Sequence, residues 1–244
     1  MQQSLDSTSQ TQTAITDSRQ NQRPGGFLEP LMSDFRIICE RDPAARSWLE
    51  VIFCYPGFHP LSLHRLAHCL HIRKVGFIPR LISHLGRFLT GIEIEPGTEI
   101  GKGVFIDHGM GVLIGDTAIV GDYALIYQGV TLGGTGKESG KRHPTLGNNV
   151  VVGTGAKVLG NIQISEHVRI SVGSIVLRDL PPDSTVVGIP GRIISHKQSK
   201  PLSPLEHGKL LDVEAGIIRS LVSQIEKPEQ QLKTLKNQHQ DEDS

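Results

Sequence analysis

A branched aliphatic residue recurs at every sixth position between residues 94 and 176. The rhythm slips by two residues after Ile106 and is interrupted again between Leu132 and Leu146. The full series is Ile94, Ile100, Ile106, Ile114, Val120, Ile126, Leu132, Leu146, Val152, Val158, Ile164, Ile170 and Val176. The residue after the aliphatic one is often glycine, and the residue four positions after it is usually small. The pattern therefore indicates an internal repeat, which is a stronger guide to the fold than local propensity.

A period of six matches neither the repeat of a helix, about 3.6 residues, nor the alternation of a flat strand. It matches a short strand followed by a corner, three of which close one triangular coil with the aliphatic side chain pointing inward. Glycine and small polar residues tolerate the corner dihedrals. We therefore predict a parallel β-helix over residues 92–195, with about four to five coils across residues 94–180. An ordinary β-sandwich would need hairpin turns roughly every 8–12 residues, and the sequence shows no such spacing of turns.

Residues 28–91, before the repeat, are predicted to form a helical domain. Asp42-Pro43 has the features of a helix start, with a carboxylate at the N-cap and proline in the first turn. The following residues carry apolar side chains at helical spacing, which predicts a helix over 44–55. Two more helices are predicted over 60–73 and 79–89. The chain is thus expected to be mainly β with flanking helices.

The two ends of the chain differ from the middle in composition. Residues 1–27 are rich in Gln, Ser and Thr with few apolar residues, and we predict a disordered tail. A transit peptide is the alternative for this segment, although Asp6 and Asp17 are unusual in one. Residues 196–244 are predicted to form a C-terminal helical extension, amphipathic over 203–235, with a polar tail.

Charge and cysteine content exclude several classes of protein. Lys plus Arg and Asp plus Glu both number 25, so the formal net charge is zero, and neither a nucleic acid nor a membrane is expected as a partner. No apolar run approaches the roughly 20 residues that span a bilayer. Cys39, Cys54 and Cys69 form an odd set without metal-ligand spacing, which favours a reducing, cytoplasmic location over a disulfide framework.

Both interruptions of the six-residue rhythm carry histidine. The first spans residues 106–111 and contains His108, and the second spans residues 133–144 and contains His143. A regular β-helix needs neither, so we expect these segments to carry function. His108 is suited to act as a general base, because an imidazole titrates near neutral pH. The structural alternative is that His108 only caps a corner and that the second segment is a tolerated bulge.

Specific motifs then point to one family. The runs Asp107–Gly111, Gln128–Lys137 and Arg142-His143-Pro144 resemble the signature of the serine acetyltransferases, which are hexapeptide-repeat acyltransferases. The segments Asp42-Pro43, Gly57-Phe58-His59 and Gly188–Gly191 match the same family. The resemblance implies a left-handed β-helix, whereas the general crossover rule alone would predict a right-handed one. It also implies transfer of acetyl from acetyl-CoA to the hydroxyl of L-serine, giving O-acetylserine for cysteine biosynthesis.

The resemblance implies a role for each residue at a matching position. His108 is the general base, Glu93 is its carboxylate partner at a position where many members have aspartate, and His143 contacts the substrate near its hydroxyl. The cysteines lie outside the histidine-bearing segments, so direct transfer is expected rather than an acyl-enzyme. No metal and no permanently bound cofactor are implied.

Serine binding is implied for three charged residues. Asp42 and Asp107 bind the ammonium group of serine, and Arg142 forms a bidentate clamp on its carboxylate. Each has a structural alternative: Asp42 is also the expected helix cap, Arg142 can be a solvated loop cation, and His143 can be a rigid residue before proline. The helical histidines His59, His64, His68, His71 and His84 are all expected to be structural.

The resemblance also implies how the substrates and partners are arranged. Acetyl-CoA lies in the groove between two β-helices, with its pantetheine arm against Gly134, Thr135, Thr154 and Gly173. The glycine-rich loop after residue 133 is then a flap over the acyl donor, since it lacks the context of a P-loop. A homotrimer is implied, with His108 of one chain and His143 of its neighbour in each site.

Two regulatory partners follow from the same resemblance. L-cysteine is the implied feedback inhibitor, because it has the shape of serine. Members that dock into O-acetylserine sulfhydrylase do so through a C-terminal isoleucine, and this sequence ends in Asp241-Glu242-Asp243-Ser244. Docking by that route is therefore not expected.

Three other functions fit the same fold. A sugar or amino-sugar acceptor is one, although Asp42 and Arg142 suit a zwitterion better. A zinc enzyme like the γ-type carbonic anhydrases would need three converging imidazoles, for which His108, His143 and His167 are available. A non-catalytic scaffold is the third, but it would need neither His108 nor His143.

Overall fold

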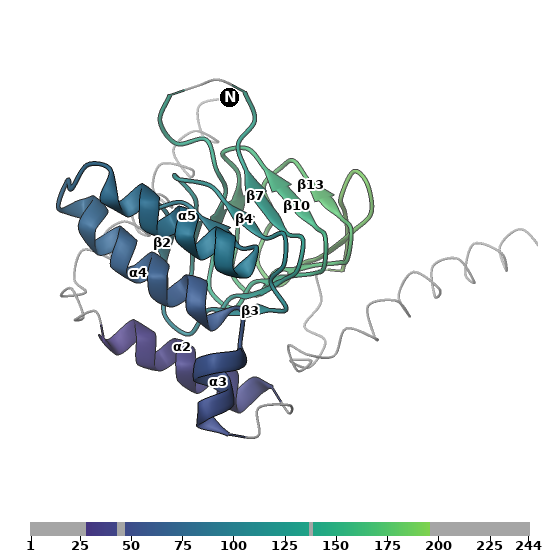
Figure 1. Ribbon diagram of the computed structural model, residues 1–244. Coiled ribbons are helices and arrows are strands. Elements are labelled where there is room, and N and C mark those ends of the chain that lie inside the picture. The colour runs from purple at the N-terminus through teal and green to yellow at the C-terminus, as the bar shows by residue number, and fades with distance from the viewer. Residues whose placement is uncertain (1–27, 43–46, 137–138, 196–244) are drawn as a thin grey trace, which may run out of the picture. The chain divides into compact units, whose positions relative to one another are not determined.

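The computed structural model describes residues 28–42, 47–136 and 139–195 (Figure 1). Four helices come first: α2 (Leu28–Arg41), α3 (Trp48–Cys54), α4 (Phe58–Ile72) and α5 (Ile78–Thr90). Helices α4 and α5 agree within two residues with the predictions for 60–73 and 79–89. The predicted disordered tail at residues 1–27 and the predicted C-terminal helix within 196–244 both lie outside the described residues.

The predicted helix start at Asp42-Pro43 is wrong for α3. That helix begins at Trp48, and its N-cap is Ser47, whose hydroxyl accepts a hydrogen bond from the backbone N–H of Glu50 at 3.2 Å. Ser47 and Glu50 have the spacing of a capping box, a signal that competes with Asp-Pro in this segment. Asp42 instead follows the end of α2, and its backbone N–H donates to the carbonyl of Ile38. Its side chain is therefore available for another role.

Fifteen short strands follow the helices and wind into a β-helix. They form three sheets: β1-β4-β7-β10-β13, β2-β5-β8-β11, and β3-β6-β9-β12-β14-β15. Every pairing is parallel except that of β14 with β15 at the end of the third sheet. From β1 to β13 consecutive strands belong to different sheets, so this part of the chain visits each sheet once per coil (Figure 1).

The strand bounds confirm the short-strand reading of the six-residue repeat. They are β1 (Glu93–Ile94), β2 (Glu99–Ile100), β3 (Phe105–Asp107), β4 (Leu113–Ile114), β5 (Ile119–Val120), β6 (Leu125–Tyr127), β7 (Thr131–Gly133), β8 (Thr145–Leu146), β9 (Val151–Val152), β10 (Lys157–Leu159), β11 (Gln163–Ile164), β12 (Arg169–Ile170), β13 (Ile175–Val176), β14 (Thr185–Val187) and β15 (Arg192–Ser195). The first sheet contains five strands, one from each successive coil.

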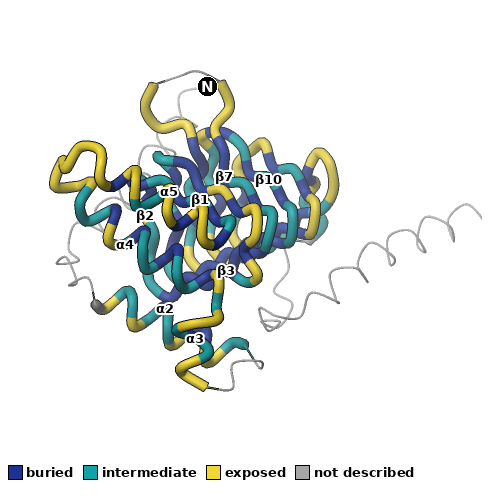
Figure 2. The backbone as a smooth tube through the Cα atoms, viewed as in Figure 1, coloured by how far each residue is buried: buried dark blue, intermediate teal, exposed yellow. Residues whose placement is uncertain are grey.

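The repeated aliphatic residues form the core of the β-helix. In the first sheet Ile94, Ile114 and Leu132 stand in register, and Val158 and Val176 continue the same column. Every member of the series is buried except Ile100, which is partly buried against the same cluster. Figure 2 shows the buried residues concentrated along the coils. Parallel stacking of identical hexads places like side chains over one another, so burial of the columns stabilises every coil.

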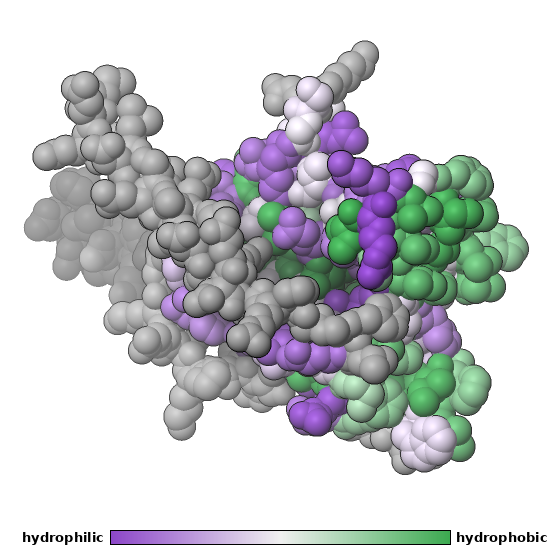
Figure 3. All heavy atoms as spheres, turned by 90° about the vertical axis from the view of Figure 1, so that its left-hand side faces the viewer, coloured by the Kyte–Doolittle hydropathy of each residue, from purple (hydrophilic) through white to green (hydrophobic). Residues whose placement is uncertain are grey.

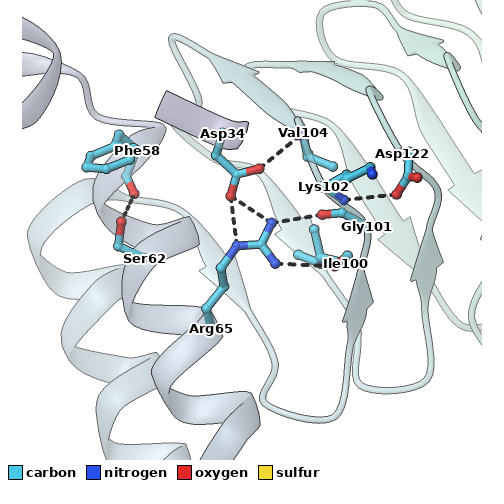
Figure 4. Close-up of polar contacts among 9 residues, drawn as sticks. All are labelled: Asp34, Phe58, Ser62, Arg65, Ile100, Gly101, Lys102, Val104 and Asp122. Atoms are coloured by element: carbon cyan, nitrogen blue, oxygen red, sulfur yellow. Dashed lines mark hydrogen bonds and ion pairs between the residues drawn. The ribbon is translucent and has the colours of Figure 1, made fainter. Parts of the chain in front are cut away.

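The helices are joined to the first coil by a buried ion pair (Figure 4). The carboxylate of Asp34 in α2 accepts from Nε of Arg65 in α4 at 2.7 Å and from the backbone N–H of Val104 at 3.1 Å. The guanidinium of Arg65 also donates to the carbonyl oxygen of Gly101 at 2.8 Å. Burial raises the pKa of Asp34 to about 6 in spite of the neighbouring guanidinium, so the carboxylate is charged at neutral pH. These bonds hold α2, α4 and the turn after β2 together.

Three of the expected structural histidines of α4 contact the protein interior or the backbone, whereas His71 is exposed. His64 is buried, and burial lowers its pKa to about 3, so it is neutral at physiological pH. Nδ1 of His68 lies 2.9 Å from the carbonyl oxygen of Pro96, and Nε2 of His59 lies 2.7 Å from that of Ile52.

Helix α5 leaves an apolar face uncovered within the chain. Its large side chains at helical spacing are between 45% and 86% exposed: Ile78, Leu81, Leu85, Phe88 and Leu89. Apolar atoms gather in patches on the molecular face drawn in Figure 3. An amphipathic helix whose apolar stripe faces outward indicates a surface that another molecule covers. Among the described residues, no helix is long and apolar enough to cross a membrane.

Candidate active site

His108 lies at a corner that has been lengthened by insertion. Register pairs Asp107 with Tyr127 and Leu113 with Thr131, so residues 108–112 occupy the corner that residues 128–130 occupy in the next coil. The first coil therefore contains two extra residues here, which explains the slip in the hexad series. The backbone of His108 has a φ of 57° and its side chain is 78% exposed. The same left-handed φ occurs at other corner residues such as Tyr123 and Asn149, so the insertion, rather than the backbone angle, distinguishes the corner of His108.

Glu93 is the predicted carboxylate partner of His108, but in the structure a different carboxylate lies beside the imidazole. Nε2 of His108 lies 3.9 Å from Oδ1 of Asp107, the preceding residue. The carboxylate of Glu93 in β1 instead forms an ion pair with Arg87 in α5 at 3.1 Å. Within one chain the described contacts therefore join His108 to Asp107, and the role of Glu93 as its partner stays a prediction.

Asp42 and Asp107 belong to one polar cluster with two tyrosines. The hydroxyl of Tyr55 donates to Oδ2 of Asp42 at 2.7 Å. Burial first, and then the bond to Asp42, raise the pKa of Tyr55 well above its ordinary value. The pKa of Tyr127 is raised by burial first, and the negative charges of Asp107 and Asp42 act on it in the same direction. Both hydroxyls therefore stay protonated at neutral pH.

Neither tyrosine of this cluster was predicted from the sequence. Tyr55 directly precedes the Pro56-Gly57 turn, and Tyr127 directly precedes the run beginning at Gln128. Each tyrosine directly precedes a recognised motif, and this position is the feature of the sequence that could have identified it. Two carboxylates that share one cluster with protonated hydroxyls form a site that suits an ammonium group.

His143 is packed against the backbone of the coil below it. It is buried, and a Cβ added to Gly115 would lie 2.1 Å from its Nε2. Its Nδ1 accepts a hydrogen bond from the backbone N–H of Thr117 at 3.2 Å and lies 2.8 Å from the hydroxyl of the same threonine. Burial first, and then the charge of Arg142, lower the pKa of His143, while Glu95 and Asp116 oppose the shift. The imidazole is therefore neutral at physiological pH.

Arg142 lies beside this histidine and is exposed. Its side chain passes close to Gly134, where an added Cβ would lie 3.2 Å from Cγ of Arg142. The beginning and the end of the long interruption, at Gly134 and Arg142, therefore lie next to each other. Thr135 lies near the next coil, since a Cβ added to Gly160 would be 3.2 Å from its hydroxyl.

A column of glycines runs from the His108 corner along the β-helix. Gly111, Gly129, Gly155 and Gly173 occupy the equivalent corner in successive coils, each with φ between 68° and 76°. The backbone N–H of each glycine after Gly111 donates to the carbonyl oxygen of the residue that precedes the column glycine of the previous coil. For Gly173 this acceptor is the carbonyl oxygen of Thr154, at 2.8 Å. Two of the four expected acetyl-CoA contacts, Thr154 and Gly173, are therefore direct neighbours.

The dihedral angles alone do not require glycine in this column. The equivalent column at another corner carries side chains at nearly the same φ, between 56° and 58°: Tyr123, Asn149, His167 and Asp183. A Cβ at Gly155 or Gly173 would meet nothing within 4 Å. The glycines therefore leave a strip of backbone without side chains, which an extended ligand can approach closely.

The alternative zinc site requires converging ligands. Among the residues that the structure describes, no three or more His, Cys, Asp or Glu side chains are placed to hold a metal ion. Within one chain His143 is bound to Thr117, and Nδ1 of His167 lies 3.4 Å from Asp183 at a different corner from His108.

Comparison with known proteins gives the same fold and a specific family. No family model matches the chain. The serine acetyltransferase of Synechococcus elongatus is 65% identical over 209 residues, which cover 86% of this chain and 85% of that protein. The chain belongs to the serine acetyltransferase family. It is therefore an acyltransferase that acts on serine, as the sequence motifs predicted.

Two solved structures extend the comparison to three dimensions. A serine acetyltransferase of Neisseria gonorrhoeae in complex with serine aligns with a TM-score of 0.67 at 34% identity, covering 75% of this chain and 72% of that one. A serine acetyltransferase in complex with cysteine aligns with a TM-score of 0.69 at 35% identity, covering 73% and 68%. The similarity confirms the predicted left-handed β-helix with N-terminal helices.

Proposed function

We propose that this serine acetyltransferase uses acetyl-CoA as donor and His108 as general base, and that it forms no covalent enzyme intermediate. His108 accepts the proton of the serine hydroxyl while the oxygen attacks the thioester carbonyl. The C–S bond then breaks, and the proton passes to the departing thiolate, giving O-acetylserine and CoA. Cys39, Cys54 and Cys69 all lie on helices outside the β-helix, which supports direct transfer.

The position of His108 at the head of the glycine column is the observation that carries this proposal. The strip from Gly173 through Gly155 and Gly129 leads to Gly111, which lies in the same lengthened corner as His108. A pantetheine arm lying along this strip places its thioester end near an exposed imidazole. Gly134 and Thr135 stand after β7, where they can contact the same donor from the other end of the first sheet.

The acceptor site is proposed to lie among Asp42, which follows α2, and the charged groups of the two interruptions. Asp42 and Asp107 bind the ammonium group of serine, Arg142 binds its carboxylate, and His143 contacts the hydroxyl region. The clustering of Asp42 and Asp107 around Tyr127 supports the first part. L-cysteine differs from serine only in its thiol, so it is proposed to bind the same site as an inhibitor. The related structures containing serine and cysteine support both ligands.

A homotrimer is proposed, with sites shared between neighbouring chains. The exposed stripe of α5, from Ile78 to Leu89, supports burial of this face in an assembly. Large apolar side chains that remain in water are otherwise unfavourable by about 25 cal/mol per Å². A cytoplasmic location is proposed from the cysteine content.

The decisive experiment follows the thioester absorbance of acetyl-CoA with and without L-serine. We expect serine-dependent loss in the unchanged protein and a decrease of roughly 10²–10⁴-fold in His108→Ala, because general base catalysis contributes about that factor. His167→Ala is a matched control, since His167 is also exposed at a corner with φ of 58°. Full activity of His108→Ala would exclude this histidine as the base. Turnover that does not depend on serine would exclude serine as the acceptor.

A further inference from the structure

Thr117 connects to the segment that carries Arg142 and His143 through all of its polar groups. It lies in the turn between β4 and β5, 26 positions before His143 in the chain. Its hydroxyl oxygen accepts hydrogen bonds from the backbone N–H groups of Arg142 at 3.1 Å and His143 at 3.2 Å. Its carbonyl oxygen accepts from Nζ of Lys141 at 2.6 Å. One residue therefore fixes three consecutive residues at the end of the long interruption.

The same threonine determines where the proton of His143 sits. The two N–H groups from the backbone occupy both lone pairs of the Thr117 hydroxyl, so its own hydrogen is directed to Nδ1 of His143, 2.8 Å away. The backbone N–H of Thr117 donates to the same nitrogen at 3.2 Å. An N–H group can only donate, so Nδ1 must be the unprotonated nitrogen. The neutral imidazole then carries its proton on Nε2.

We propose that Thr117 is a positioning residue that holds Arg142 and His143 in place and fixes His143 as a neutral imidazole with its proton on Nε2. The proposal rests on the proposed function, in which Arg142 and His143 bind serine. A neutral Nε2–H group is a hydrogen-bond donor and not a base. His143 can therefore hold the oxygen of the serine hydroxyl or the developing oxyanion, while proton removal is left to His108.

The surroundings of His143 support the neutral donor. Protonation of Nδ1 would require that nitrogen to release both Thr117 donors. Arg142 and Lys141, on the same segment, add positive charge beside the ring, while Glu95 and Asp116 face it with negative charge. Burial and the cations outweigh the carboxylates and lower the pKa of His143.

The kinetic test compares two substitutions of Thr117. Thr117→Val keeps the shape of the side chain and removes the hydroxyl, and we expect kcat/KM for serine to fall by about 10- to 100-fold, because small displacements of catalytic groups have effects of this order. KM for acetyl-CoA is expected to change by less than about twofold. Thr117→Ser restores the hydroxyl and is expected to recover most of the activity. Thr185→Val, in β14 of the last coil, is the control for removing a threonine hydroxyl. Serine kinetics in Thr117→Val that equal those of Thr185→Val would overturn the proposal.

A spectroscopic test is independent of turnover. In the full chain labelled with ¹⁵N-histidine, the His143 signal is assigned by its loss in His143→Gln. We expect its Nδ1 resonance to be that of an unprotonated nitrogen and its Nε2 resonance that of an N–H group at neutral pH. A proton on Nδ1 would overturn the proposal. The expected spectrum together with absence of serine-dependent turnover would instead contradict the proposed function and leave the positioning role standing.

Discussion

The ring of His143 occupies the space that a side chain at position 115 would fill. A Cβ added to Gly115 would lie 2.1 Å from Nε2 and 2.2 Å from Cδ2 of this imidazole. Gly115 follows β4, so a residue in one coil leaves the space that a histidine from the long interruption requires. Gly115, the small residue after the aliphatic position of the repeat, thus has two roles: it forms a corner, and it leaves space for the side chain of His143.

This relationship predicts the effect of adding one methyl group. Gly115→Ala must displace the imidazole, because a contact of 2.1 Å is far inside van der Waals distance. We expect kcat/KM for serine to decrease by about 10²-fold, as for other small misplacements of a catalytic group. Gly76→Ala is the matched control, since an added Cβ there meets nothing within 4 Å. Steady-state kinetics with varied serine measure the effect, and equal values for the two variants would disprove the packing argument.

The glycine column predicts where bulk interferes with the acyl donor. Gly155→Asn introduces a residue type that tolerates a left-handed backbone, as Asn149 does at the other corner with a φ of 56°. The new side chain stands on the exposed strip, and we expect KM for acetyl-CoA to rise by about tenfold or more, while KM for serine stays within about twofold.

The reverse substitution at the other corner supplies the control. Asn149→Gly clears a corner that is not proposed to bind the donor, and both KM values should remain close to those of the unchanged protein. If Gly155→Asn and Asn149→Gly gave the same KM for acetyl-CoA, the donor would not lie along the glycine column.

The buried ion pair between Asp34 and Arg65 predicts a large loss of stability when one partner is removed. Arg65→Met removes the cation that lowers the pKa of Asp34 and leaves the buried carboxyl without its partner, whether it stays charged or takes up a proton, so we expect the free energy of unfolding to fall by about 3–5 kcal/mol. Arg80→Met removes an exposed pair with Glu95 and should cost at most about 1 kcal/mol. Urea denaturation at one chain concentration measures both. A similar, small decrease in the free energy of unfolding of both variants would show that the buried Asp34–Arg65 pair contributes no more to stability than an exposed pair.

Burial of His64 predicts loss of stability in acid. Its pKa is lowered from 6.5 to about 3 in the folded chain, so below pH 6.5 the unfolded chain binds a proton that the folded chain does not. The free energy of unfolding therefore falls as the pH decreases from about 6.5 to about 3, by up to about 1.4 kcal/mol per pH unit from this residue. Urea titrations at several pH values give the free energy of unfolding as a function of pH, and this free energy should fall less steeply in acid for His64→Gln than for the unchanged protein.

The control for the acid effect is on the same helix. His71 is exposed in α4, so His71→Gln should keep the slope of the unchanged protein. If the slope were the same in His64→Gln as in His71→Gln, another group would be responsible for the acid sensitivity.

The sequence by itself determined the β-helix and the family. Each inward position from Ile94 to Val176 had to be apolar for its coil to have a core. The six-residue period of the fold is therefore visible in the sequence as a six-residue period of aliphatic residues. The two-residue slip after Ile106 located His108, because a regular repeat does not need the extra residues and inserted loop segments often carry function. The chemistry-bearing motifs around Asp107 and Arg142 identified the family without structural information.

Local signals were weaker where they competed. Asp42-Pro43 predicted a helix start, whereas the capping-box spacing of Ser47 and Glu50 was not recognised in the sequence. The structure gives the N-cap to Ser47 and places Asp42 next to Tyr55. Whether an aspartate caps a helix or enters a site depends on what faces it, and that is a tertiary property.

Only the tertiary structure decided the contacts between residues far apart in the chain. Thr117 and His143, Gly115 and His143, and Asp34 and Arg65 meet because coils and helices stack, and no pattern along the chain records these pairs. The reason for glycine in the column from Gly111 to Gly173 likewise became clear only by comparison with Tyr123 and Asn149, which carry side chains at nearly the same φ. A repeat specifies its own core because each hexad buries itself in the same way, whereas a site is assembled from the few positions that depart from the repeat.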